Sequence, residues 1–148
     1  MKGAAIVLAA FVGSWNIRVR YWPQPGAPVQ EGDGTAEIRW VLNGRYIEQR
    51  QETRLPGGPS SGIGYVGFDE GEGRYVSIWL DGLGVLHTSG APDLSGKSVR
   101  TRGRMGRLDI EERMTPAGPG RFLYEAWTSR SDGEGRRRVM AIVYTRRR

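Results

Sequence analysis

The sequence predicts an all-β fold, a roughly ten-stranded antiparallel barrel with a short N-terminal helix or cap. Three observations predict it. Apolar and polar residues alternate with a period of two along most of the chain, which is the pattern of half-buried strands. The alternating segments are short and regularly spaced, as in antiparallel barrels. Finally, 23 glycines among 148 residues supply the positive φ angles that tight hairpins need.

Ten segments carry this alternation, and turn-forming pairs such as Asn43-Gly44, Asp81-Gly82 and Asp132-Gly133 separate several of them. The predicted strands are residues 15–22, 35–42, 46–53, 63–68, 75–81, 85–89, 98–104, 108–114, 122–129 and 138–145. Two longer stretches rich in proline and glycine, 23–34 and 55–62, are predicted to form loops at the mouth of the barrel.

The N-terminal residues 1–12 contain a short apolar run after Lys2. The run is too short to span a bilayer and leads into the first strand without a polar spacer or a small-x-small cleavage site. We therefore expect a cap packed on the barrel in preference to a cleaved secretory signal. The predicted organisation is one domain, 1–148, with a cap (1–12), a barrel (13–145) and a basic tail (146–148). A cytoplasmic location is expected, or a secreted or periplasmic one if 1–12 belong to a signal.

The composition excludes several kinds of site. Without cysteine there is no disulfide, no thiolate metal site and no cysteine nucleophile. His87 is the only histidine, which excludes a multi-histidine metal centre. We expect neither a metal nor a cofactor. The formal charge of +6 is compatible with anionic partners. Nucleic acid is an unlikely partner, however, because acidic residues alternate with the arginines and the aromatic residues lie in the opposite strand phase.

Both faces of the predicted strand at residues 75–81 carry large side chains, so both are expected to be buried. Val76, Ile78 and Leu80 form one apolar face, and the other face is aromatic and polar. A barrel with a partly apolar outer wall must cover it with the N-terminal segment or with a second subunit. The sequence therefore predicts a homodimer, with no membrane contact.

Aromatic side chains in one strand phase suggest a ligand pocket inside the barrel, because such side chains combine an apolar body with a polar tip. The alternative is an ordinary barrel core in which their hydroxyl and N–H groups are satisfied. The candidate ligand-binding residues are Trp40, Tyr46, Tyr65, Trp79, Tyr124 and Tyr144.

Three residues are candidates for proton transfer. His87 lies a short hairpin away from Asp81, so an imidazole and a carboxylate could meet across a strand pair and exchange a proton near neutral pH. The alternative for His87 is a rim histidine bonded to a neighbour. Glu48, and also Glu125, could gain a raised pKa if they pointed into an apolar cavity, although both could equally face solvent.

Three further acids, Asp109, Glu111 and Glu112, are interpreted as one wet strand face. They oppose the arginine row at positions 100, 102 and 104 on the preceding strand. This arrangement predicts a cross-strand charge ladder that contributes modest stability, and no catalysis.

Several stretches resemble a bacterial family of lipocalin-like β-barrels classified as a domain of unknown function. They are Gly13-Ser14-Trp15 and the residues 41–48, 64–69, 74–81 and 142–146. The resemblance covers nearly the whole chain, with Phe68 where the family commonly has tyrosine. It implies a barrel shaped like those of lipocalins, fatty-acid-binding proteins and haem-binding nitrobindins, and it implies no activity.

The resemblance also implies two details. Arg45 would pair with Asp69 or cover Trp15, as an arginine often covers the tryptophan near the closed end of lipocalin-type barrels. The proximal histidine of nitrobindin-like relatives has no counterpart here, because the C-terminal strands offer Tyr124, Met140 and Tyr144 instead. A haem site is therefore not expected.

The function that these observations favour is binding of a small hydrophobic or amphipathic molecule in the barrel cavity, with Asp81, His87 or Glu48 fixing a polar end. The alternative is a cofactor-free isomerase, cyclase or hydrolase acting on a hydrophobic substrate in the same cavity. A third hypothesis is a structural or nucleic-acid-binding dimer without a cavity.

Overall fold

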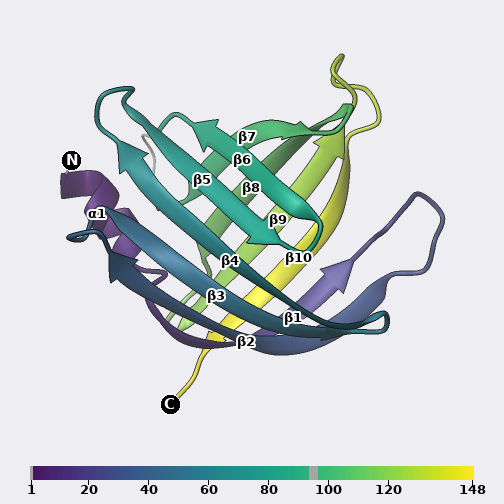
Figure 1. Cartoon of the computed structure of the whole chain (residues 1–148), viewed down its shortest axis with the longest axis horizontal. Helices are drawn as coiled ribbons and strands as arrows, with labels where there is room; N and C mark the ends of the chain where they lie inside the picture. Colours follow the sequence, from purple (N-terminus) through teal and green to yellow (C-terminus); the bar gives the residue numbers. More distant parts are fainter. Residues whose placement is uncertain (1, 94–96) are drawn as a thin grey trace.

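The computed structural model describes residues 2–93 and 97–148 of the chain. A short helix precedes ten antiparallel strands that close into one barrel (Figure 1), which confirms the predicted fold class. The elements are α1 (Lys2–Ala9), β1 (Gly13–Tyr21), β2 (Gln30–Val41), β3 (Tyr46–Leu55), β4 (Gly58–Asp69), β5 (Arg74–Asp81), β6 (Gly84–Gly90), β7 (Val99–Met105), β8 (Leu108–Pro116), β9 (Arg121–Ser129) and β10 (Arg137–Arg146).

The barrel closes because β1 pairs with β2 on one side and with β10 on the other. Every other pairing joins strands that are consecutive in the chain. The β6–β7 pairing is much shorter than the rest, with Thr88 opposite Gly103 and Ser89 opposite Arg102. The two strands diverge beyond these residues toward the end of the barrel opposite α1 (Figure 1).

The two largest differences from the predicted strand starts are in β2 and β4, which begin well before the predicted residues 35 and 63. β2 starts at Gln30 and β4 at Gly58, inside the stretches predicted as mouth loops. The reason is visible at Gly34, where a Cβ atom would lie 1.9 Å from the carbonyl oxygen of Glu52 on β3. The glycine allows the two backbones to approach closely within the sheet, so here it belongs to a strand and not to a loop.

Figure 1 shows α1 at one end of the barrel. An aromatic core packs against the N-terminal segment at this end. The Trp15 and Phe122 rings meet edge to face with centroids 4.7 Å apart. Phe11, just after α1, packs edge to face on Phe122 at 4.9 Å, and its carbonyl accepts a hydrogen bond from Trp15 Nε1 at 3.0 Å. These contacts attach the N-terminal segment to the barrel, and Ala4 and Leu8 of α1 are buried with them.

An arginine does cover Trp15, but it is Arg146 and not Arg45. The Arg146 guanidinium carbon lies 4.3 Å from the Trp15 ring centroid, and Arg146 Nη1 donates to the carbonyl of Val12 at 3.0 Å. The antiparallel pairing of β1 with β10 places Trp15 directly opposite Arg146, which is the physical reason.

The outer wall of β5 and β6 carries apolar side chains that α1 leaves open, because the helix lies over the end of the barrel (Figure 1). Ile78 is 38 % exposed and Leu80 39 % exposed. No helix within the described part of the chain has the length and hydropathy needed to cross a membrane.

Candidate functional site

Glu112 on β8 faces the interior of the barrel. It lies opposite Thr101 on β7, whose residue is only 3 % exposed, and opposite Ala126 on β9. Its neighbours two positions away on the same strand are Ile110 and Met114, which belong to or pack against the hydrophobic clusters. Because strand side chains alternate between faces, Glu112 shares their inward face.

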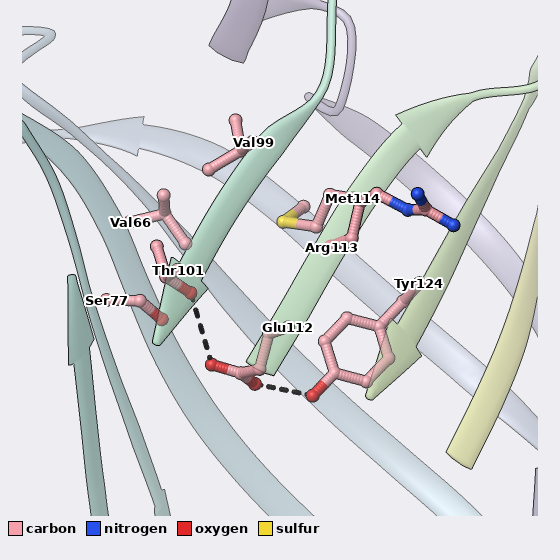
Figure 2. Close-up of a pocket in the computed structure, with 8 residues that line it drawn as sticks. All are labelled: Val66, Ser77, Val99, Thr101, Glu112, Arg113, Met114 and Tyr124. Carbon is pink, nitrogen blue, oxygen red and sulfur yellow. Dashed lines mark hydrogen bonds between the residues drawn. The ribbon is translucent and has the colours of Figure 1, made fainter. Parts of the chain in front are cut away.

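Three hydroxyl groups surround this carboxylate, two of which, those of Thr101 and Tyr124, are drawn in Figure 2. The Tyr124 hydroxyl donates to Glu112 Oε2 at 2.5 Å. Thr88 Oγ1 lies 2.9 Å from Glu112 Oε1 and 2.8 Å from Thr101 Oγ1, and the Thr101 hydroxyl is 3.5 Å from the same carboxylate oxygen. Four strands, β6 to β9, thus contribute one polar side chain each. We call Thr88, Thr101, Glu112 and Tyr124 the inner polar cluster.

A small cavity adjoins the inner polar cluster. Its volume is about 30 Å³, which is room for one or two water molecules. The lining residues are Val66, Ser77, Val99, Thr101, Glu112, Arg113, Met114 and Tyr124 (Figure 2). The guanidinium of Arg113 points away from Glu112 in that view and donates to Glu125 at 2.8 Å on the outside of the barrel.

The surroundings of Tyr124 keep its phenol protonated. Burial raises the pKa of Tyr124 well above its ordinary value, and the nearby negative charge of Glu112 raises it further. At neutral pH Tyr124 is therefore a fixed hydrogen-bond donor to Glu112.

A second polar group lies on the inner faces of β3 and β10. The Tyr144 hydroxyl is 3.1 Å from the side-chain oxygens of both Gln49 and Gln51, and Gln49 Nε2 donates to Gln51 Oε1 at 2.8 Å. Burial raises the pKa of Tyr144 well above its ordinary value, so this phenol is also neutral. The interior thus has polar side chains on two separate stretches of its wall.

Trp79 forms part of the inner wall near the mouth. Cβ atoms at Gly62 and Gly64 would lie 2.0 and 2.6 Å from Trp79 ring atoms, so the two glycines allow the indole to lie against β4. Trp79 Nε1 donates to Asp81 Oδ2 at 3.0 Å. Among the other predicted pocket residues, Trp40 is partly buried against the core opposite Ile47.

Three predicted site residues lie on the outer wall. Tyr46 covers Gly67, and Tyr65 donates to Glu48 Oε2 at 2.8 Å. Glu48 also accepts from Arg39 Nε at 3.1 Å and Arg50 Nε at 3.2 Å. The inward residue of this stretch is Ile47, so the β3 register places its neighbours Tyr46 and Glu48 outside.

The environment of Glu48 is the opposite of the one that a raised pKa requires. The Tyr65 hydrogen bond, followed by those of Arg39 and Arg50, outweighs the effect of burial and lowers the pKa of Glu48, although the residue is only 5 % exposed. Glu48 is a fixed anion within a surface ion cluster.

The structure does not bring Asp81 and His87 together. Asp81 pairs with Gly84 and shares the inner face of β5 with Trp79, whereas His87 pairs with Ile78 and lies exposed on the outer face. The Asp81 carboxylate is occupied by Trp79 and by the backbone N–H of Leu83 at 2.8 Å. A proton exchange between the two side chains would have to cross the sheet.

The charge ladder between β7 and β8 forms for two of its three predicted acids. Arg102 Nη2 lies 2.8 Å from Glu111 Oε1, and Arg104 lies 3.8 Å from Asp109. Glu112 does not take part, because adjacent residues of a strand point to opposite faces and Glu111 is the outward one. The interpretation of all three acids as one wet face missed this alternation, which the sequence pattern Ile110, Glu112, Met114 already contains.

Glu125, the other carboxylate considered from the sequence, is buried but on the outside. It accepts hydrogen bonds from Arg113 at 2.8 Å and Arg138 at 2.9 Å. Burial alone would raise the pKa of Glu125, but the two arginines outweigh it and lower the pKa. Within the described ranges, no group of three or more histidine, cysteine, aspartate or glutamate side chains could hold a metal ion.

The family model described as "Protein of unknown function (DUF1579)" matches residues 6–146. No curated protein matches the chain. Among solved structures, Rv2717c from M. tuberculosis is 18 % identical with a TM-score of 0.70, covering 98 % of both chains.

Two further solved structures share the barrel. The S-type phycobiliprotein lyase CPES from Guillardia theta is 15 % identical with a TM-score of 0.67, covering 95 % of this chain and 90 % of the other. EF1p2_mFAP2b bound to DFHBI is 11 % identical with a TM-score of 0.56, covering 97 % and 99 %. At these identities the similarity establishes the shared fold.

Proposed function

We propose a ligand-binding function for this chain, which belongs to the DUF1579 family of proteins of unknown function. The ligand is a small hydrophobic or amphipathic molecule whose polar end enters the cavity of about 30 Å³ at the inner polar cluster, while its body lies outside that cavity, toward the mouth of the barrel. The observation that carries the proposal is Glu112, an inward-facing carboxylate beside a small cavity to which Val66, Val99 and Met114 contribute apolar surface.

Burial of apolar ligand surface would supply most of the binding free energy, at about 25 cal/mol per Å². A few polar groups at fixed positions would then set the orientation. A protein that shares this fold, EF1p2_mFAP2b, is bound to the small molecule DFHBI. On the proposed path from the mouth, the apolar part of the ligand would contact Trp79, and its polar end would reach Tyr124 and Glu112.

A cavity-filling substitution tests this proposal. Ser77 lines the cavity, and its neighbour Val76 on the same strand points outward. With Nile red as the probe, wild type and Val76→Phe should enhance the dye fluorescence, and Ser77→Phe should not. Circular dichroism and thermal unfolding establish that both variants are folded. Equal dye binding by a folded Ser77→Phe would overturn the proposal.

A cofactor-free enzyme remains the alternative, and the pair that favours it is Glu112 with Tyr124. A carboxylate and a phenol in hydrogen-bond contact beside a cavity are groups that can hold or move a proton. Loss of turnover in Glu112→Gln with ligand binding retained would support this alternative. The separation of Asp81 from His87 gives no support to those two residues as the acid and base.

A homodimer is also proposed, with the outer wall of β5 and β6 as its contact. Ile78, Leu80 and Val85 are exposed there, and Leu83 at the hairpin tip is 99 % exposed. Light scattering should give the mass of a dimer for wild type and of a monomer for Leu80→Glu. A monomeric wild-type protein at the same concentration would contradict the proposal.

A further inference from the structure

The charge of Glu112 is not matched by a nearby cation. Among the described residues, no arginine, lysine or histidine forms an ion pair with it, and its partners are the neutral hydroxyls of Thr88, Thr101 and Tyr124. Arg113 is the only basic residue that lines the cavity, and it is already bound by Glu125 and lies 4.9 Å from the Trp127 ring. Glu112 is partly buried, and a positive charge brought to a partly buried carboxylate that has no counter-ion is stabilised.

The hydrogen-bonding capacity that remains in the inner polar cluster is that of an acceptor. A hydroxyl that donates its proton to a carboxylate keeps lone pairs that can accept. Tyr124, Thr88 and Thr101 use their protons on Glu112 or on each other. The inner polar cluster therefore presents oxygen lone pairs to a ligand, and a ligand group with several N–H donors is the complement.

The size of the cavity limits which polar group of a ligand can enter it. Its volume of about 30 Å³ accepts a group the size of one or two water molecules. A primary ammonium group has this size and carries three donors. A carboxylate or phosphate head is larger and would bring a negative charge against Glu112.

Resting on the proposed function, we infer that the polar end of the ligand is a protonated amine, so that the barrel binds an amine-bearing amphiphile. The ammonium group contacts Glu112 and the hydroxyl oxygens of the inner polar cluster. The alkyl or aromatic body extends toward the mouth along Trp79.

Three amphiphiles with the same chain test this inference. Dodecylammonium, dodecan-1-ol and dodecanoate are titrated, below their micelle-forming concentrations, against wild-type protein carrying Nile red. Dodecylammonium should displace the dye at a concentration at least about tenfold lower than dodecanoate, with the alcohol between them. Because the whole protein carries a formal charge of +6, a general surface effect would favour the anion. A cation preference must therefore arise locally.

Two variants locate the preference. Glu112→Gln should reduce the difference between dodecylammonium and dodecanoate to less than about threefold while dodecan-1-ol still binds. Glu111→Gln makes the same change of charge one residue away on the outer face and should keep the wild-type preference. The wild-type titrations require no variant, so a misfolded Glu112→Gln leaves the test intact.

The outcomes separate the two proposals. Equal displacement by the cation and the anion, or a preference for the anion, overturns the amine inference and leaves the binding function standing. A cation preference that survives in folded Glu112→Gln also overturns it. If wild type binds neither Nile red nor any of the three amphiphiles, the binding function itself fails.

Discussion

Glutamates on the outer face of the barrel wall are bound by arginines, whereas the glutamate on the inner face is not. On the outside, three carboxylates each accept from two arginines: Glu48 from Arg39 and Arg50, Glu111 from Arg102 and Arg136, and Glu125 from Arg113 and Arg138. On the inside, Glu112 is bonded to hydroxyls alone. The outer carboxylates have their charge compensated within the protein and contribute to its stability. The charge of Glu112 is not compensated within the described part of the protein, so its carboxylate is available to a ligand.

The largest expected effect is a loss of stability in acid. The pKa values of Glu48, Glu111 and Glu125 are all lowered from 4.5 in the folded protein. The stability that these carboxylates contribute is complete above the unfolded value and is lost as the pH falls through the folded values. In urea unfolding, the free energy of unfolding should therefore be the same at about pH 6 and about pH 7. It should fall steeply below about pH 4.5. A free energy of unfolding that stays constant through the acid range would contradict this role.

Removal of one outer carboxylate should be costly by itself. Glu125→Gln leaves Arg113, whose Nε is already buried without a partner, and Arg138 without their counter-charge. We expect a loss of about 2 kcal/mol in the free energy of unfolding. Glu134→Gln is a matched control, because Glu134 is mostly exposed and lies 3.7 Å from a single arginine. An effect of Glu125→Gln no larger than that of the control would show that the outer clusters are unimportant for stability.

On each face of the barrel wall, one tyrosine donates a hydrogen bond to a glutamate, so substitution of the two tyrosines compares the faces directly. Tyr65→Phe removes a donor from Glu48, which keeps two arginines, and should cost less than the matched change on the inner face. Tyr124→Phe removes a donor from Glu112, which has no arginine, and should cost about 1.5 kcal/mol. The measurement is denaturant unfolding of both variants at neutral pH. The reverse order of the two losses would contradict the difference between the faces.

Glu112→Gln should change the stability of the protein only slightly. The substitution removes an uncompensated charge and keeps an oxygen that can accept from Tyr124. Thermal unfolding should therefore show a change within about 1 kcal/mol of wild type, in either direction. A loss as large as that of Glu125→Gln would mean that Glu112 serves the fold and is not reserved for a ligand.

Much of the fold follows from local patterns in the sequence. The alternation of residues such as Trp15, Ile17 and Val19 identifies a half-buried strand wherever one face is clearly apolar. The first residues of β2 are not predicted, because Gly32 and Gly34 signal a loop locally, and only the partner strand β3 shows that close approach of the two backbones requires glycine there. The close neighbours are backbone atoms of β3, and the sequence around the two glycines does not reveal them.

The candidate site was less accessible to prediction. On β3 both faces carry polar residues, so the sequence does not show whether Glu48 or Gln49 points inward, and register with β2 and β4 decides it. On β8 the signal was present, since Glu112 lies between the apolar Ile110 and Met114 in the same phase. Trp79 and Tyr124 are predicted from their aromatic character, because on residues 75–81 both faces carry large side chains and the sequence does not show which one points inward. The partners of Glu112 come from β6, β7 and β9, and such a convergence depends on tertiary structure.

The most direct test of binding inside the barrel is methyl NMR on the complex with the tightest-binding dodecyl amphiphile. Met114 lines the cavity, and Ile78 lies on the outer wall. The account predicts nuclear Overhauser contacts from the ligand to the Met114 methyl group and none to the Ile78 methyl groups. Contacts to Ile78 with none to Met114 would place the ligand on the outer wall and contradict the account.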